Sequence, residues 1–211
     1  MRETNLQSNP RSVARSAFAL AVAVLVLALT GTGPAPAGDS NDQPASPELP
    51  AAPEGAAEAL APLAPFVGKT WRGELAGSDP DRPMVDVSRW EWALNGKAIR
   101  TVHSINDGAY GGESLIFQDP EGEGLVSFYF TTGGFYTRGT IEVLGPGRFV
   151  ARDEVIGNED GVTRVRATSE LLPDGRFRVV AEHFKDGEWV PGNERTYVEA
   201  PDAEVVFRNP E

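Results

Sequence analysis

The sequence has no cysteine and only two histidines, His103 and His183, among its 211 residues. The first absence excludes disulfides, thiolate metal sites, iron–sulfur clusters and a cysteine nucleophile. The second excludes a metal site built mainly from imidazole. Basic residues are also scarce, because 19 Lys and Arg stand against 31 Asp and Glu, which gives a formal net charge of −12. So acidic a surface repels phosphate, and we expect no nucleic acid among the partners.

The motifs of the common enzyme classes are also missing. The chain contains no nucleophile elbow, P-loop, dinucleotide fingerprint, zincin helix or EF-hand loop. The sequence therefore predicts no catalytic residue and no resident metal ion.

The N-terminus has the pattern of an export signal. Arg2, Arg11 and Arg15 precede an apolar run over 17–29, and small residues follow at Ala35 and Ala37. The run is shorter than the roughly 20 residues of a membrane span and matches a signal-peptide core. We predict a signal peptide over 1–37, and hence a periplasmic or secreted protein with no membrane span after cleavage. An uncleaved N-terminal anchor is the alternative.

Residues 38–59 are rich in proline, alanine and acidic residues and contain no aromatic or basic residue. Such a segment cannot bury enough apolar surface to offset its ordering entropy. We predict a disordered linker over 38–59, a single β-barrel domain over 60–201 and a C-terminal tail over 202–211.

Within the predicted domain, runs of β-branched and aromatic residues alternate with turn signals such as Asn95-Gly96 and Asp107-Gly108. The connections are too short for parallel crossovers, so the strands form an antiparallel up-and-down meander. About ten strands in sequence close into a barrel. We predict an all-β fold with a short helical lead-in over 59–66 and strands over 69–76, 84–94, 97–106, 112–118, 125–132, 135–143, 148–156, 162–172, 176–185 and 188–199.

The stretch Phe66-Val67-Gly68-Lys69-Thr70-Trp71 resembles the entry to the first strand of calycin barrels: lipocalins, fatty-acid-binding proteins and nitrobindin-like proteins. In those families a short helix leads to a Gly-x-Trp motif, whereas the spacing here is Gly-x-x-Trp. The segment from Val87 to Glu113 resembles uncharacterised bacterial proteins of this barrel type. The resemblance covers about residues 63–200, and it implies the fold more than an activity.

Both histidines lie on apolar faces of predicted strands. His183 shares its face with Phe177, Val179 and Ala181, and His103 shares its face with Ile99 and Ile105, because side chains alternate with period two. On such a face each histidine can point into the barrel as part of a binding site. The alternative is a hydrogen-bonded histidine or one at the rim. The nitrobindin-like resemblance implies a haem ligand near the C-terminus, and His183 is the only residue that could correspond.

Three further groups are candidates for ligand contacts. Arg195 and Tyr197 face the same side of the last strand, and fatty-acid-binding proteins hold a ligand carboxylate with an Arg-x-Tyr there. Arg89 and Glu91 face one side of a strand whose other side carries Trp90 and Trp92, and either side can be the interior. Tyr129 belongs to an aromatic cluster around Gly133-Gly134, with Phe128, Phe130, Phe135 and Tyr136.

These observations predict an exported barrel that binds a small apolar or amphipathic molecule through Arg89, Glu91, His103, Tyr129, His183, Arg195 and Tyr197. One alternative is an enzyme in the same barrel, for instance a haem-dependent isomerase using His183. Another is a non-catalytic envelope protein that acts through its surface. Haem is the only cofactor suggested, and the oligomeric state stays open.

Overall fold

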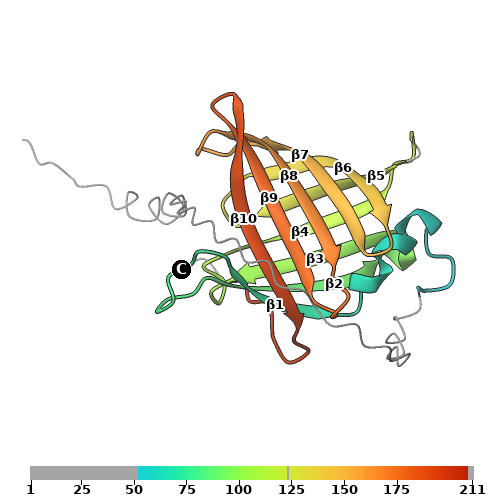
Figure 1. Ribbon diagram of the computed structural model, residues 1–211. Coiled ribbons are helices and arrows are strands. Elements are labelled where there is room, and N and C mark those ends of the chain that lie inside the picture. The colour runs from blue at the N-terminus through green and yellow to red at the C-terminus, as the bar shows by residue number, and fades with distance from the viewer. Residues whose placement is uncertain (1–51, 123, 209–211) are drawn as a thin grey trace, which may run out of the picture. The chain divides into compact units, whose positions relative to one another are not determined.

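The computed structural model describes residues 52–122 and 124–208. Ten antiparallel strands follow one another around a closed barrel, and β1 completes it by pairing with β10 (Figure 1). The predicted all-β meander barrel is confirmed. The predicted signal peptide and residues 38–51 of the predicted linker lie outside the described residues. The strands are β1 (Thr70–Leu75), β2 (Val85–Ala93), β3 (Ala98–Ile105), β4 (Tyr110–Gln118), β5 (Leu125–Thr131), β6 (Tyr136–Gly145), β7 (Arg148–Ile156), β8 (Val162–Leu171), β9 (Phe177–Lys185) and β10 (Glu188–Glu199).

Tight turns set the register of the hairpins. At the β3–β4 and β9–β10 connections, Asp107-Gly108 and Asp186-Gly187 adopt positive φ values, between 53° and 91°. Two consecutive residues with positive φ match the right-handed twist of the flanking strands. Between β2 and β3 the same conformation occurs at Asn95 and Gly96, within the short 3₁₀ turn η3 (Leu94–Gly96).

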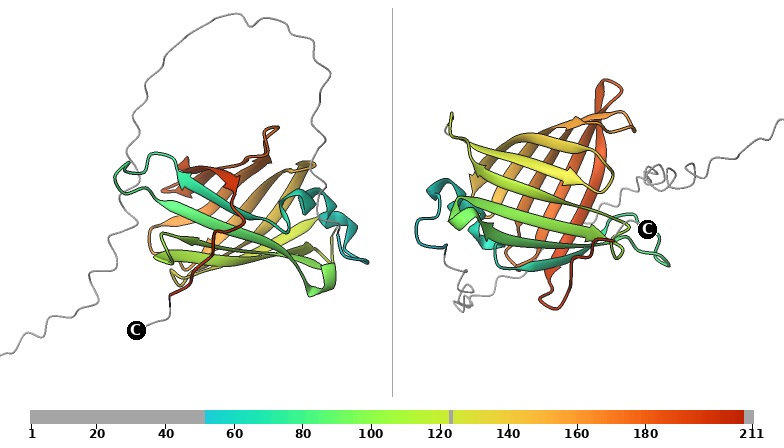
Figure 2. Two further views of the ribbon diagram at one scale, coloured as in Figure 1. Left: turned by 90° about the horizontal axis from the view of Figure 1, so that it is seen from below. Right: turned by 180° about the vertical axis from the view of Figure 1, so that it is seen from behind.

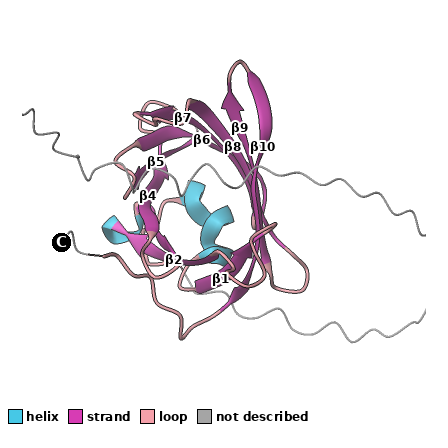
Figure 3. Ribbon diagram, turned by 90° about the vertical axis from the view of Figure 1, so that its left-hand side faces the viewer, coloured by secondary structure: helices cyan, strands magenta, loops and turns pink. Residues whose placement is uncertain are grey.

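One short helix, η2 (Glu58–Phe66), lies inside the ring of strands at one end of the barrel (Figures 2 and 3). It is a 3₁₀ helix, in which side chains three residues apart lie on one face. Leu60, Leu63 and Phe66 have this spacing and are completely buried. Pro62 lies on another face, where its carbonyl accepts a hydrogen bond from Gly147 in the β6–β7 turn, 2.9 Å away. The helix therefore closes this end of the barrel. It also confirms the short helical lead-in predicted over 59–66.

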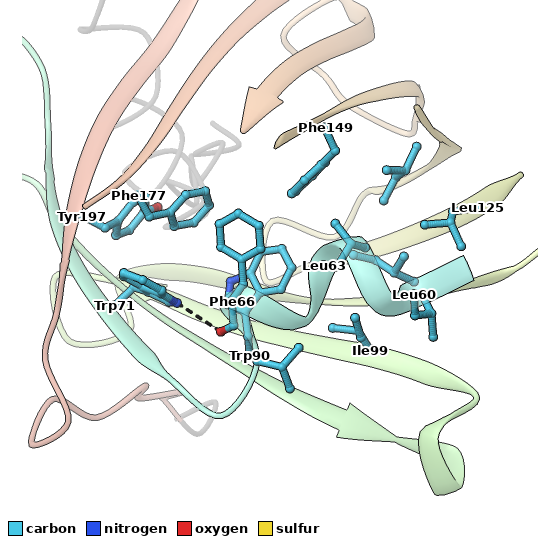
Figure 4. Close-up of a cluster of buried hydrophobic side chains, with 13 residues drawn as sticks. Leu60, Leu63, Phe66, Trp71, Trp90, Ile99, Leu125, Phe149, Phe177 and Tyr197 are labelled. Carbon is cyan, nitrogen blue, oxygen red and sulfur yellow. Dashed lines mark hydrogen bonds between the residues drawn. The ribbon is translucent and has the colours of Figure 1, made fainter. Parts of the chain in front are cut away.

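An aromatic cluster joins the helix to the barrel wall (Figure 4). Phe66 contacts the rings of Trp71, Trp90, Phe149 and Phe177, at centroid distances of 4.7 to 6.4 Å. The indole of Trp71 also donates a 3.3 Å hydrogen bond to the carbonyl of Phe66. Burial of an aromatic side chain of this size stabilises a fold by about 2–3 kcal/mol, so the cluster fixes both the helix and the plugged end.

Short segments before β1 and after β10 pack against the outside of the barrel. The amide of Ala57 donates to the carbonyl of Gly96, and the Lys97 ammonium donates to the carbonyl of Gly55. After β10, the amide of Val206 donates to the hydroxyl of Ser104 on β3, and Arg208 donates to the carbonyl of Asp107. Ordered structure therefore extends on both sides of residues 60–201.

The two ends of the barrel differ. The plugged end carries η2, and the opposite end, called the far end here, is formed by the β1–β2, β3–β4, β5–β6, β7–β8 and β9–β10 connections. No helix within 52–122 or 124–208 is long and apolar enough to cross a membrane.

Candidate functional site

A network of polar side chains lies inside the barrel, between the aromatic cluster and the far end. Its centre is Asp86 on β2, which is completely buried. One carboxylate oxygen, Oδ2, accepts hydrogen bonds from Nη1 of Arg195 and from the hydroxyl of Tyr197, both at 2.6 Å. The other, Oδ1, is 2.9 Å from Nδ1 of His103. Strands β2, β3 and β10 therefore meet at one carboxylate.

The network continues from His103 across the barrel. Its Nε2 is 2.7 Å from the hydroxyl of Tyr129 on β5. That hydroxyl is 3.3 Å from the hydroxyl of Tyr110 on β4. The order Asp86–His103–Tyr129 places a carboxylate on one imidazole nitrogen and a phenol on the other, which fixes the orientation of the ring. The network thus ends in hydroxyl groups that face the interior.

Electrostatics favour an ionised Asp86. Burial alone would raise the pKa of Asp86, but the hydrogen bond from His103 and the charges of His103 and Arg195 outweigh it and lower the pKa to about 2. Burial raises the pKa of Tyr197, whose neighbour Asp86 is already negative. The arginine and the aspartate thus form a buried ion pair, with Tyr197 as a neutral donor.

The guanidinium of Arg195 does not use all of its hydrogen-bond donors. Both of its hydrogen bonds, to Asp86 and to the hydroxyl of Tyr197, use Nη1. Its Nε is buried and has no partner among the described residues. A buried polar group without a partner costs roughly 1–3 kcal/mol. Since a guanidinium only donates, the missing partner is an acceptor such as a carbonyl or a carboxylate.

Two glycines make room for the network. A Cβ on Gly112 of β4 would lie 2.3 Å from the ring of Tyr129 and 2.4 Å from the carbonyl of Phe130. A Cβ on Gly73 of β1 would lie 2.9 Å from the ring of Tyr197. Neither glycine carries the positive φ of a turn, so their role is close approach rather than backbone freedom.

The opposite wall of the interior is apolar and made of small side chains. Its row across β7, β8 and β9 consists of Ala151, Ala167 and Ala181, which are direct cross-strand partners. All three are only half-buried, as are Val165 and Val179 beside them. These small inward-facing side chains take up little of the interior in front of them.

His183 faces the same interior but does not join the network. Its Nε2 lies 2.9 Å from the position that a Cβ on Gly192 would occupy. Burial, and then the charge of Arg195, lower the pKa of His183, so the ring is held neutral. A haem would require a ring nitrogen open toward the interior, whereas Nε2 lies over the β10 backbone in this conformation. The arrangement does not fit axial ligation, and we derive no chemistry through haem.

The structure places Arg89 and Glu91 on the outer surface, which corrects the prediction that they line the interior. The inward residues of β2 are Asp86, Ser88 and Trp90, since the Trp face is the buried one. Glu91 instead pairs with Arg89 and with Arg100 on β3, at 3.1 and 2.8 Å. Such exposed pairs contribute little, about 0–1 kcal/mol each.

Four predicted site residues, His103, Tyr129, Arg195 and Tyr197, come together in the network. Asp86, its centre, was not predicted. The signal was present, because the face of Trp90 and Trp92 reaches Asp86 when it is followed back in steps of two. Tyr110 was missed because its hydroxyl meets that of Tyr129 across two strands, between residues 19 positions apart.

The aromatic cluster predicted around Gly133-Gly134 divides between the two faces of the sheet. Tyr129 points inward, whereas Phe128 and Phe130 lie on the outer face. There Phe128 stacks on Phe117 and Phe130 stacks on Tyr136, with interplanar angles of 6° and 25°. These contacts are cross-strand packing.

The outer face of β5–β8 carries part of a groove of about 760 Å³, where its lining includes Phe128, Trp189, Arg138, Arg152, Arg164 and Arg166. The inward residues Ser127, Gly139, Asp153 and Val165 also line this groove. Three of these arginines already have acidic partners: Arg138 pairs with Glu154, Arg152 with Glu142 and Arg166 with Glu182. The interior offers the stronger site, because the Nε donor of Arg195 is buried and has no partner among the described residues. No cluster of metal-ligating side chains occurs in the described part of the chain.

Comparisons with known proteins assign the chain to no family. No protein-family model matches the sequence, and no curated protein matches it. Among solved structures, the chain is similar to the crystal structure of Rv2717c from M. tuberculosis, with 16% sequence identity and a TM-score of 0.49. That match covers 69% of this chain and 99% of the other.

Proposed function

We propose that the protein is a calycin-like barrel that binds a small amphipathic molecule in its interior, with an accepting group of the ligand on Arg195. The observation that carries the proposal is the buried Nε of Arg195, which finds no partner in the described part of the chain while Nη1 makes two hydrogen bonds. A ligand carbonyl or carboxylate would supply the missing acceptor, and a carboxylate would form the stronger, charge-assisted bond.

The remainder of the ligand is apolar. The small side chains of Ala151, Ala167 and Ala181 leave accessible apolar surface on the wall opposite the network. Covering such surface stabilises a complex by about 25 cal/mol per Å² before the costs of association. An alkyl chain along this wall covers its apolar surface, and the polar end of the same ligand accepts a hydrogen bond from Arg195.

The proposal retains the predicted location, periplasmic or secreted, which depends on the predicted signal peptide. In that compartment a cysteine-free barrel needs no redox control.

Calorimetric titration with decanoate and decanol at pH 7.5 tests the proposal. The two compounds share a chain and differ in the accepting group, so we expect both to bind and decanoate to bind more tightly. Replacing the ion pair together, D86N/R195Q, removes both of its opposite charges and should weaken decanoate at least tenfold relative to decanol. The matched control R178Q/E194Q removes an ion pair on the outer surface and should leave both affinities unchanged.

Two results would overturn the proposal. One is that neither compound binds the wild-type protein. The other is that D86N/R195Q binds decanoate as tightly, relative to decanol, as the wild type does.

A further inference from the structure

A second buried ionisable group, Asp153 on β7, faces the interior apart from the Asp86 network. It belongs to the row of inward residues that crosses from Ser127 on β5 through Gly139 on β6. The hydroxyl of Ser127 donates a 3.1 Å hydrogen bond to Oδ1 of Asp153. Within residues 52–122 and 124–208, Oδ2 makes no hydrogen bond and no cationic side chain lies within ion-pair distance. Asp153 is therefore a half-buried carboxylate with one neutral partner.

Gly139 on the neighbouring strand makes room for this carboxylate. A Cβ on Gly139 would lie 2.6 Å from Oδ1 of Asp153 and still closer to the carbonyl of Arg152. On the other side, the cross-strand partner is Val165, which is half-buried, and His183 follows on β9. Tyr129 on β5 and His183 on β9 are the ionisable inward residues nearest along the wall, and neither is a cation at neutral pH, since burial lowers the pKa of His183.

Retaining this carboxylate is costly for the fold. Burial raises the pKa of Asp153 to about 6, against which the Ser127 hydrogen bond acts only in part. At pH 7.5 the group is nevertheless ionised, so the barrel holds an unpaired negative charge beside its apolar wall. Carboxylates perturbed in this way, without a structural counter-charge, are typical of binding and catalytic sites.

The chemistry of the site selects the ligand group. An ionised carboxylate only accepts hydrogen bonds, so its complement is a donor, and a positively charged donor gains most. One carboxylate and one hydroxyl are too few oxygen ligands for a calcium ion, which takes six to eight. A protonated amine needs only one or two acceptors and can extend an alkyl chain along the neighbouring alanine wall.

We propose that Asp153 forms a second subsite of the barrel interior, which binds a protonated amine of an amphipathic ligand. This inference rests on the proposed function, since both place the ligand inside the barrel. It adds that the interior accepts a cationic group on β7 as well as an accepting group at Arg195 on β10.

The test adds decylamine to decanol in calorimetric titrations of the intact protein at pH 7.5 and 150 mM salt. Because the protein is acidic overall, any amine is attracted to it, and D160N provides the matched control. Asp160 lies exposed in the β7–β8 turn, so D160N changes the net charge as D153N does. We expect decylamine to bind at least tenfold more tightly than decanol to the wild type and to D160N. D153N should lose this preference, and so should the wild type at pH 5, where Asp153 is protonated.

The outcomes separate the two proposals. If decanol and decanoate bind but decylamine shows no preference, or if D153N keeps the preference, the Asp153 subsite is refuted and the Arg195 site stands. If no decyl compound binds, the proposed function itself fails. Asparagine matches aspartate in size and removes the buried charge, so D153N is expected to fold.

Discussion

Replacing Asp153 by asparagine should stabilise the barrel, and by an amount that depends on pH. Burial raises the pKa of this carboxyl from 3.8 to about 6. For a group with a raised pKa, the stabilising contribution is fully present below the unfolded-state pKa and is lost as the pH rises through the folded-state pKa. The buried carboxyl therefore lowers the free energy of unfolding of the wild type by about 3 kcal/mol at pH 7.5, taking 1.36 kcal/mol per pH unit, and by about 0.6 kcal/mol at pH 4.

Urea denaturation followed by tryptophan fluorescence measures this difference. We expect D153N to exceed the wild type in free energy of unfolding by up to about 3 kcal/mol at pH 7.5, and by less than about 1 kcal/mol at pH 4. D160N, on the exposed β7–β8 turn, should match the wild type at both pH values. A D153N protein that is less stable than the wild type at pH 7.5, or a difference independent of pH, would refute the reasoning. A stabilising change at a binding residue is the usual trade between stability and function.

Three further predictions concern the network and the plug. G112A should destabilise the barrel by about 1–3 kcal/mol, because its Cβ would meet the Tyr129 ring and the Phe130 carbonyl, whereas G124A, with open space around its Cβ, should be neutral in the same urea titration. F66A should cost about 3–5 kcal/mol by removing the ring that joins η2 to the barrel; a thermal midpoint equal to that of the wild type would contradict the plug. The pKa of Asp86 is lowered to about 2, so its carboxylate stabilises the fold above pH 3.8 and loses this contribution as the pH falls through 2. Between pH 5 and pH 2, the free energy of unfolding of the wild type should therefore fall by about 2 kcal/mol more than that of D86N/R195Q. Acid titration followed by circular dichroism checks this.

The fold was predictable because its determinants are local. Each strand alternates with period two, and turns such as Asp107-Gly108 and Asp186-Gly187 are marked by residues that tolerate positive φ. Short connections then leave a meander as the only topology. The helical lead-in was predictable as well, since Leu60, Leu63 and Phe66 precede the first strand at helical spacing.

The site was predictable only in part, because a strand does not say which of its faces is inside. Along β2, one face carries Arg89 and Glu91 and the other carries Trp90 and Asp86. The plug decides between them, since Phe66 packs on Trp90. For His103, the apolar face left the direction open, and the structure places its ring inside, against Asp86 and Tyr129.

Hydrogen-bond partners on different strands could not be predicted from the sequence. The bond from Arg195 to Asp86 joins residues 109 positions apart, and it requires that β10 close on β1 and β1 pair with β2. Asp153 shows the same limit. Its inward direction follows from Phe149 and Ala151 on the same face, but only the pairing with β6 shows that Gly139 accommodates its carboxylate.

The location of bound decanoate shows whether an amphipathic ligand lies inside the barrel with its polar end at Arg195. We would determine the crystal structure of the protein with decanoate at a concentration above the measured Kd. We expect the carboxylate of decanoate within hydrogen-bond distance of Nε of Arg195 and its alkyl chain against Ala151, Ala167 and Ala181. Decanoate seated in the outer groove of β5–β8, with an interior occupied only by ordered water, would contradict it.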